Sequence, residues 1–172
     1  NVGMSYLGSK IYGQGFLMTP EQASDVRLHK PEEASAVFPY IGGEEVNSHP
    51  VQQHSRYVIN FGTRNLDEVS GQYPTLLQQV MDLVKPERDR AGDTPDGRVL
   101  KDNWWQFFRP RTELYAALAP LQRCLVTACV SKHLMFSFQP TDRIFSHKLY
   151  AFPIDTFTAF TVLQSRIHEP WA

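Results

Sequence analysis

The chain has 172 residues and a net charge of −1, and its length suits one domain better than two. Its two cysteines exclude a disulfide-based scaffold. No apolar run approaches the roughly 20 residues of a membrane-spanning helix, and no N-terminal segment has the pattern of a signal peptide. We therefore expect a globular cytoplasmic protein with no membrane partner.

The charge is unevenly distributed along the chain. Residues 1–97 contain eight Lys and Arg against 13 Asp and Glu, whereas residues 98–148 contain eight against three, a local net charge of +5. A basic stretch of this kind suits a polyanionic partner. The alternative is a solvated surface whose basic side chains hold no ligand.

The N-terminal part predicts a strand followed by a helix. Residues 11–18 are typical of a strand, and the two glycines within it indicate a bulge or a close backbone approach. Thr19 and Gln22 predict a capping box at the start of a helix that extends to about Lys30. A helical turn is expected near residues 32–36.

The middle of the chain alternates predicted loops and regular elements. Residues 39–55 are rich in Gly, Pro, Asn, Ser and His and predict a loop. Residues 56–61 predict a strand, and apolar spacing predicts a helix over 74–85. Residues 87–103 predict a second, polar loop, and residues 112–118 a further helix.

The C-terminal part has a strand pattern. Four short runs predict a meander of antiparallel strands, namely residues 124–131, 134–139, 143–146 and 149–152. A helix capped by Asp155 is then expected to present one apolar face made of Phe157, Phe160, Leu163 and Ile167. The predicted fold class is α+β, a single domain with a mixed, mainly antiparallel sheet packed with α-helices.

The sequence does not predict a metal site. Cys124 and Cys129 are five residues apart on a predicted strand, so their side chains point to opposite faces and cannot share a metal or form a disulfide. We expect both in the core. His49 and His54 lie in a loop without a third ligand near in sequence, and zinc needs three or four.

Signatures of nucleophilic catalysis and phosphate binding are also missing. Ser131 and His133 are close in sequence, but no serine has the Gly-x-Ser-x-Gly setting. Residues 13–15 supply Gly-x-Gly without the third glycine of a dinucleotide loop. Glu44 and Glu45 are interpreted as part of a solvated turn, with a pair of general acids as the alternative.

Two clusters of polar and aromatic residues remain. One is residues 104–111, in which we expect Trp104 and Trp105 mainly in the core and the arginines either framing the next helix or contacting a ligand. The other is residues 131–135, Ser-Lys-His-Leu-Met, at a junction between predicted strands.

A series of short motifs occurs along nearly the whole chain in a specific order. They are Gly8-(x4)-Gly13-Gln14-Gly15-Phe16, residues 38–48, 56–61 and 84–88, Trp104-Trp105-Gln106-Phe107, Arg111-(x2)-Leu114-Tyr115, Val130-Ser131-Lys132, and residues 162–172. The series resembles the target-recognition domain of MmeI-like (type IIL or type IIG) DNA adenine methyltransferases. These are large bacterial restriction-modification or phage-defence enzymes.

The resemblance implies a division of labour within a larger protein. In the family, an upstream domain binds S-adenosylmethionine and methylates the exocyclic amine of adenine through an Asn-Pro-Pro-Tyr/Phe motif, which does not occur here. We therefore expect residues 1–172 to be a recognition domain excised from a methyltransferase chain. It would have no cofactor or catalysis of its own, and its partners would be double-stranded DNA and the methyltransferase domain.

The resemblance also points to base-reading residues. In MmeI-like proteins the stretch after the Val-Ser motif is associated with base choice, which here implies Lys132, His133 and Met135. Some relatives carry Glu and Arg where this chain has His and Met, so its preferred bases should differ. From side-chain chemistry alone, we add Gln14 as a base reader. The candidates for phosphate or further contacts are Ser9, Lys10, Arg109, Arg111, Arg143 and Lys148.

Two other functions stay open at this point. One is a small enzyme with a pocket formed by His133, His147 and Glu44, which would show converging, perturbed groups. The other is a protein-interaction module that uses the Trp/Arg segment at residues 104–111, which would show an exposed apolar patch.

Overall fold

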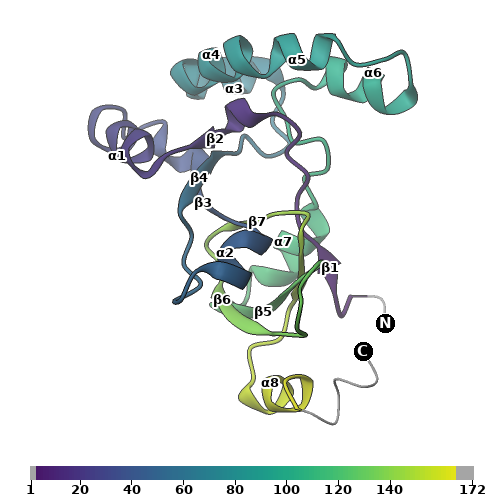
Figure 1. The fold of residues 1–172 in the computed structure, drawn as a ribbon. Coiled ribbons are helices and arrows are strands. Elements are labelled where there is room, and N and C mark those ends of the chain that lie inside the picture. The colour runs from purple at the N-terminus through teal and green to yellow at the C-terminus, as the bar shows by residue number, and fades with distance from the viewer. Residues whose placement is uncertain (1–2, 166–172) are drawn as a thin grey trace. The chain divides into compact units, whose positions relative to one another are not determined.

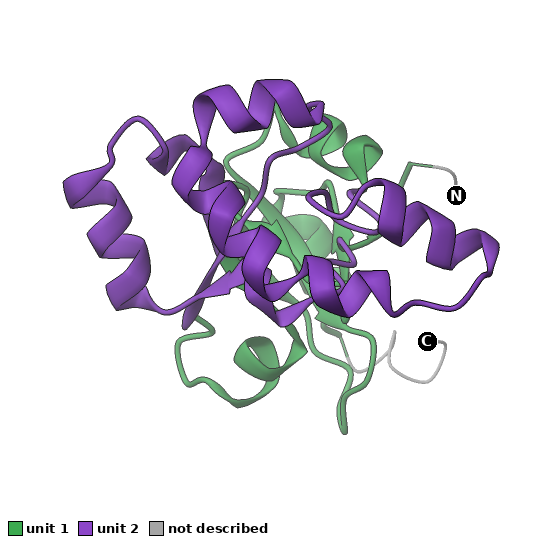
Figure 2. Cartoon of the chain, turned by 90° about the horizontal axis from the view of Figure 1, so that it is seen from above, with its two compact units in different colours: residues 1–8, 40–54, 111–172 green, residues 9–39, 55–110 purple. Residues whose placement is uncertain are grey.

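A computed structural model describes residues 3–165 of the chain and forms two compact units (Figure 2). Unit 1 takes residues 1–8, 40–54 and 111–172, and unit 2 takes residues 9–39 and 55–110. Both units mix helices with short strands, and the predicted α+β class is confirmed. Within residues 3–165, no helix is long and apolar enough to cross a membrane.

Unit 1 is built on an antiparallel sheet of four strands in the order β1-β8-β5-β6 (Figure 1). The strands are β1 (Tyr6–Leu7), β5 (Arg123–Ala128), β6 (Ser137–Pro140) and β8 (Leu149–Phe152). Strand β5 is central, and it pairs Val126 with Ser137 of β6 and with Ala151 of β8. Because side chains alternate between the two faces of a strand, Cys124 and Val126 share one face and join the core.

Two helices cover this sheet and close the core of unit 1. They are α2 (Gly43–Ser48) and α7 (Thr112–Leu118). The buried cluster consists of Ile41, Val46, Leu114, Leu118, Cys124, Val126, Phe145, Leu149 and Ala151. Burying these side chains contributes roughly 1.5–3 kcal/mol for each large one.

The predicted C-terminal meander is only partly correct. Strand β7 (Ile144–Phe145) does not join the β5 sheet but pairs in parallel with Tyr40 and Ile41, the last residues of β3 (Val37–Ile41). Helix α8 (Phe157–Leu163) follows β8 (Figure 1). Its N-cap is Thr156 and not Asp155, whose carbonyl oxygen accepts hydrogen bonds from Arg123 instead. The predicted Ile167 lies outside the described residues.

Unit 2 contains a short antiparallel pair and most of the helices. Strand β2 (Leu17–Met18) pairs with β4 (Arg56–Ile59), with Leu17 opposite Val58. The helices are α1 (Pro20–His29), α3 (Leu66–Gln72), α4 (Pro74–Leu83), α5 (Lys85–Asp89) and α6 (Pro95–Asp102), with 3-10 turns η1 (Gln14–Phe16) and η2 (Ala34–Ala36). The predicted capping box of Thr19 and Gln22 is present.

The side chain of Arg88 joins several segments of unit 2 by hydrogen bonds in its interior. Its side chain is fully buried and donates to the carbonyl oxygens of Ile11, Tyr12, Asn103 and Gln106 at 2.7–3.1 Å. Burial lowers the pKa of Arg88 to about 10, so it stays charged at neutral pH. One guanidinium therefore satisfies main-chain groups from segments far apart in sequence.

Three elements predicted from the sequence, one strand and two loops, differ from those in the structure. The strand expected over 11–18 is reduced to β2, because η1 occupies residues 14–16. The loop expected over 39–55 contains the end of β3 and all of α2, and the loop expected over 87–103 contains α6. Helix α6 is short and polar, and it begins where the Thr94 hydroxyl accepts a hydrogen bond from the main-chain amide of Gly97. Helix α3 was not predicted at all.

Candidate nucleic-acid interface

The loop between β5 and β6 carries the residues that sequence analysis assigns to base reading. This β5–β6 loop comprises residues 129–136 and closes an antiparallel hairpin. Lys132 and His133 are exposed, and Val130 is 82% exposed. Because a hairpin presents its loop to solvent, these side chains are available to a ligand.

The first half of the loop is tied to α2. The side-chain amide of Asn47 donates to the carbonyl oxygen of Val130 at 3.1 Å, and the main-chain amide of Cys129 donates to the carbonyl oxygen of Lys148 at 2.8 Å. A cavity of about 330 Å³ lies here, lined by Gly43, Glu44, Asn47, Ser48, Val130 and Lys148. The structure thus brings Lys148, a candidate from side-chain chemistry, to the same loop.

The second half of the loop is held at Met135. This side chain is half-buried and packs against the core of unit 1. The hydroxyl of Thr127 donates to the carbonyl oxygen of Met135 at 2.8 Å, and the amide nitrogen of Gln52 lies 3.5 Å from its sulfur. Met135 is therefore the anchored end of the loop, whereas Lys132 and His133 are its exposed part.

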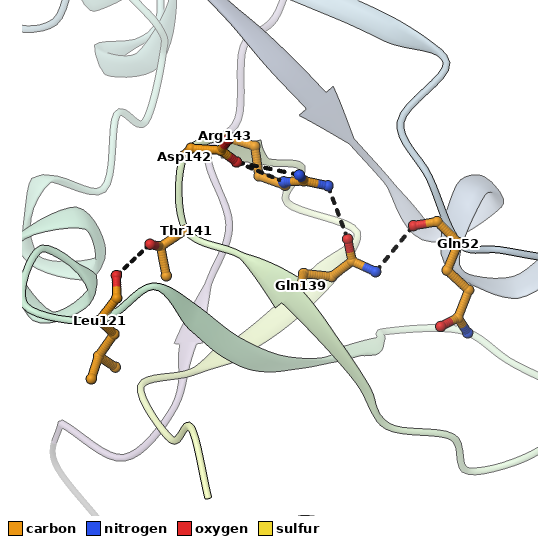
Figure 3. A network of polar contacts seen from close by, with 6 residues as sticks. All are labelled: Gln52, Leu121, Gln139, Thr141, Asp142 and Arg143. Carbon is orange, nitrogen blue, oxygen red and sulfur yellow. Dashed lines mark hydrogen bonds and ion pairs between the residues drawn. The ribbon is translucent and has the colours of Figure 1, made fainter.

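Arg143 lies in the interior of unit 1 and not on its surface. It is only 8% exposed, donates to the side-chain oxygen of Gln139 at 3.1 Å, and pairs with Asp142 at 3.2 Å (Figure 3). This arrangement does not support the expected contact with a phosphate, since the guanidinium is buried and bound within unit 1. The sequence did not indicate this, because burial of an arginine depends on how the whole chain packs, even where its partners Gln139 and Asp142 are near in sequence.

Unit 2 brings two other candidates together. Lys10 and Arg109 form an antiparallel bridge with two main-chain hydrogen bonds of 3.0 Å. Both cations approach the ring of Phe108, at 5.3 Å for Lys10 and 4.2 Å for Arg109, and Arg109 also pairs with Asp96 at 3.1 Å. Two cations thus lie beside Phe108, one of them paired with a carboxylate, and Gln14 is exposed at the start of η1.

Two further candidates, Ser9 and Arg111, contact other residues of this chain. Ser9 has no exposed surface, and its hydroxyl donates to the carbonyl oxygen of Pro110 at 2.8 Å, so the expected DNA contact has no support. Arg111 has a left-handed backbone with φ of 59°, and its guanidinium lies 3.9 Å from the carboxylate of Glu113. Its side chain keeps 34% exposure, so it stays accessible.

The Trp/Arg segment is mainly structural. Trp104 is buried, and Trp105 is half-buried with its indole N–H donating to the carbonyl oxygen of Arg64 at 3.0 Å. The amide of Gln106 donates to the same oxygen at 2.9 Å. The expected core position is thus confirmed for Trp104, whereas Trp105 is only half-buried. The interaction-module alternative gains no exposed aromatic patch in this segment.

The enzyme alternative gains no geometric support. Glu44 lines the 330 Å³ cavity, but neither His133 nor His147 does. Glu45 is not its acid partner, because Glu45 is buried and accepts a hydrogen bond from the main-chain amide of Gly42 at 2.9 Å. In the part of the chain that the structure describes, no three His, Cys, Asp or Glu residues form a metal site.

The two cysteines differ in their surroundings. Cys124 is buried as expected, and burial raises its pKa to about 12. Cys129 is exposed, which contradicts the expected core position, because β5 ends at Ala128 and the chain leaves the sheet there. Partial burial still raises the pKa of the Cys129 thiol.

Three residues that position the β5–β6 loop were not among the predicted site residues, namely Asn47, Gln52 and Gln139. Asn47 lies in one of the motifs that carry the family resemblance, and that was its only signal. Gln52 and Gln139 had none, because their role depends on hydrogen bonds between segments 87 residues apart.

Comparisons with known proteins agree with this architecture. The family model described as "MmeI, target recognition domain" matches residues 2–172. Among solved structures, the chain is similar to the type IIL restriction-modification enzyme MmeI in complex with DNA, with a TM-score of 0.75 and 19% sequence identity. The match covers 99% of this chain and 22% of the MmeI chain. No curated protein matches the chain. The chain belongs to the MmeI target recognition domain family.

Proposed function

We propose that this chain recognises the base sequence of double-stranded DNA on behalf of a restriction-modification enzyme. The observation that carries the proposal is the β5–β6 loop. It exposes Lys132 and His133, while both of its ends are hydrogen-bonded to other parts of unit 1. A reader of base edges needs exposed donors on a fixed frame. The family match and the similarity to an enzyme solved with DNA support this assignment.

Each side chain of the loop suits a different part of the duplex. The ammonium of Lys132 can donate to the O6 and N7 acceptors of guanine, and a histidine ring can donate to or accept from a base edge. The thioether of Met135 suits an apolar contact such as the methyl group of thymine. Lys148, Lys10 and Arg109 suit phosphates, which position a protein without specifying sequence.

The reaction itself belongs to another part of the whole protein. We propose that this part binds S-adenosylmethionine and methylates adenine, as the family resemblance implies, and that the present chain is not catalytic. Extracting the target adenine from the stack costs on the order of a few kcal/mol. Contacts of the recognition domain to the flanking duplex can offset this cost. The setting that follows is the bacterial cytoplasm and defence against phage DNA.

The test is to sequence modified bases in DNA from cells that express the full-length protein. The wild type is compared with a variant in which Lys132, His133 and Met135 are changed to alanine. The matched control is Lys85→Ala on α5, a lysine of unit 2 whose ammonium pairs with Asp89 at 2.6 Å. We expect the wild type and the control to methylate adenine at one asymmetric motif, and the triple variant to relax one or two positions of it.

The other outcomes distinguish base reading by the loop from methylation by the whole protein. A triple variant that methylates an unchanged motif would show that the β5–β6 loop does not read bases. A folded wild-type protein that modifies no DNA when supplied with methyl donor would remove the methyltransferase assignment. Sequence-selective binding of DNA without modification would keep recognition and exclude only that reaction.

A further inference from the structure

A buried polar network in unit 1 joins Arg143 to Gln52 through Gln139 (Figure 3), and Gln52 in turn contacts Met135 of the β5–β6 loop. Arg143 donates to the side-chain oxygen of Gln139 at 3.1 Å. The amide nitrogen of Gln139 then donates to the carbonyl oxygen of Gln52 at 3.1 Å and to the hydroxyl of Ser137 at 3.2 Å. We call Arg143, Gln139 and Gln52 the β6 network, because Gln139 lies on β6.

The charge of Arg143 determines which way the amide of Gln139 faces. A guanidinium only donates hydrogen bonds, so the oxygen of the amide must face Arg143 and its nitrogen must face Gln52. Gln139 is 3% exposed and Arg143 is 8% exposed, so water cannot readily replace either partner. A reversed amide would leave a buried donor against a donor, which is costly.

Gln52 is a conformationally demanding residue at the other end of the network. Its φ of 51° lies in the left-handed region, which residues other than glycine and asparagine seldom adopt. Its main-chain amide donates to the carbonyl oxygen of His49 at 2.9 Å, and its own carbonyl accepts from Gln139. The bond from Gln139 thus supports a strained turn that a free chain would not hold.

This turn directs the side chain of Gln52 toward the loop. The amide nitrogen of Gln52 donates to the carbonyl oxygen of Val46 at 3.1 Å and contacts the sulfur of Met135 at 3.5 Å. The main chain of Met135 is held separately by Thr127. The network therefore acts on the position of the Met135 side chain and not on the existence of the hairpin.

We propose that Arg143, Gln139 and Gln52 are positioning residues that determine base choice at the position that Met135 contacts. The proposal rests on the proposed function, since it concerns the same loop. It replaces the expectation that Arg143 contacts a phosphate with a role inside the protein. None of the three residues needs to touch DNA.

The test measures sequence preference by binding the full-length protein to a pool of randomised DNA duplexes and sequencing the bound fraction. Gln139→Glu keeps the size of the side chain and its bond to Arg143, but it places an oxygen against the carbonyl of Gln52. Gln52→Asn tolerates the left-handed backbone, but its shorter side chain does not reach Met135. We expect both variants to lose roughly tenfold in preference at the same base pairs as Met135→Ala.

The control variant is Thr141→Val, which removes a hydrogen bond near the same strand without touching the network. The hydroxyl of Thr141 donates to the carbonyl oxygen of Leu121 at 2.5 Å (Figure 3). Thr141→Val should lower the melting temperature and leave the selected motif unchanged. If the β6 network has a purely structural role, Gln139→Glu and Gln52→Asn will behave like Thr141→Val, with a lower melting temperature and an unchanged motif. That result would overturn the proposal.

A second contradictory outcome would be weaker binding of Arg143→Gln, which removes the charge, to every duplex, with a smaller dependence on salt. That result would identify Arg143 as a phosphate contact. If Gln139→Glu does not fold, Gln52→Asn decides between the outcomes. A wild-type protein that selects no motif at all would instead remove the proposed function, and this inference would be lost with it.

Discussion

The amide of Asn47 on α2 donates to the carbonyl oxygen of Val130 across 83 residues of sequence, at 3.1 Å. This bond joins a helix of unit 1 to the start of the β5–β6 loop. Val130 itself is 82% exposed and buries almost nothing, so polar contacts hold this first part of the loop, namely this bond and the bond from Cys129 to Lys148. Its removal is the most direct way to loosen the loop without altering the side chains proposed to read bases.

We expect Asn47→Ala to make residues 130–133 more mobile and to reduce sequence preference while leaving the core intact. The free energy of unfolding should fall by only about 0.5 kcal/mol, because the bond is exposed to solvent. Hydrogen exchange in this loop and urea denaturation are the measurements. The neighbouring Ser48→Ala is the control, because Ser48 lines the same cavity but does not bond the loop. Unchanged exchange in Asn47→Ala would show that the bond is not limiting.

The two lysines near the loop should have different effects on DNA binding. Lys148→Ala is expected to weaken binding to all duplexes about equally and to reduce the slope of log affinity against log salt by about 1. Lys132→Ala should reduce the affinity mainly for duplexes with the preferred base at one position. Binding titrations at several salt concentrations, on the selected motif and a shuffled one, distinguish the two. Identical profiles would contradict their separate roles.

Arg88 should be one of the residues most important for the stability of unit 2. Arg88→Met leaves buried carbonyl groups of residues such as Ile11 and Asn103 without donors, and the free energy of unfolding should fall by roughly 3 kcal/mol or more. Urea denaturation measures this loss. Arg90→Met is the matched control, since Arg90 is exposed on the surface, and its effect should stay within about 0.5 kcal/mol. Equal effects would refute the anchoring role.

The cysteines provide a pH-dependent test of the fold. The thiolate is the reactive form, and partial burial raises the pKa of Cys129, so its alkylation should be slow at pH 7 and accelerate as pH rises past the ordinary range of a thiol. Cys124, with its pKa raised to about 12 by burial, should react only after unfolding. Iodoacetamide labelling followed by mass spectrometry checks both. Fast labelling of Cys124 in the folded protein would contradict its core position.

Local patterns in the sequence were sufficient for several elements. The capping box at Thr19, the helix over residues 112–118 and the strand predicted over 56–61 and found at Arg56–Ile59 depend on neighbours within a few positions, so they follow from residue types alone. Antiparallel pairing of β5 with β6 also follows, because two adjacent strand runs favour a hairpin. The motifs place Lys132 and His133 between these strands, which is where the structure exposes them.

The roles of individual polar residues were decided only by the tertiary structure. Arg143 and Ser9 had the chemistry of DNA contacts, yet the fold buries both. Ser9 donates to Pro110, 101 residues away, whereas Arg143 bonds Gln139 and Asp142, which are near it in sequence. Long-range contacts also place Gln52 beside Met135 and join it to Gln139. A residue type states which hydrogen bonds a side chain can make, but burial determines whether water, a ligand or the protein supplies the partner. That burial is the outcome of packing the whole chain.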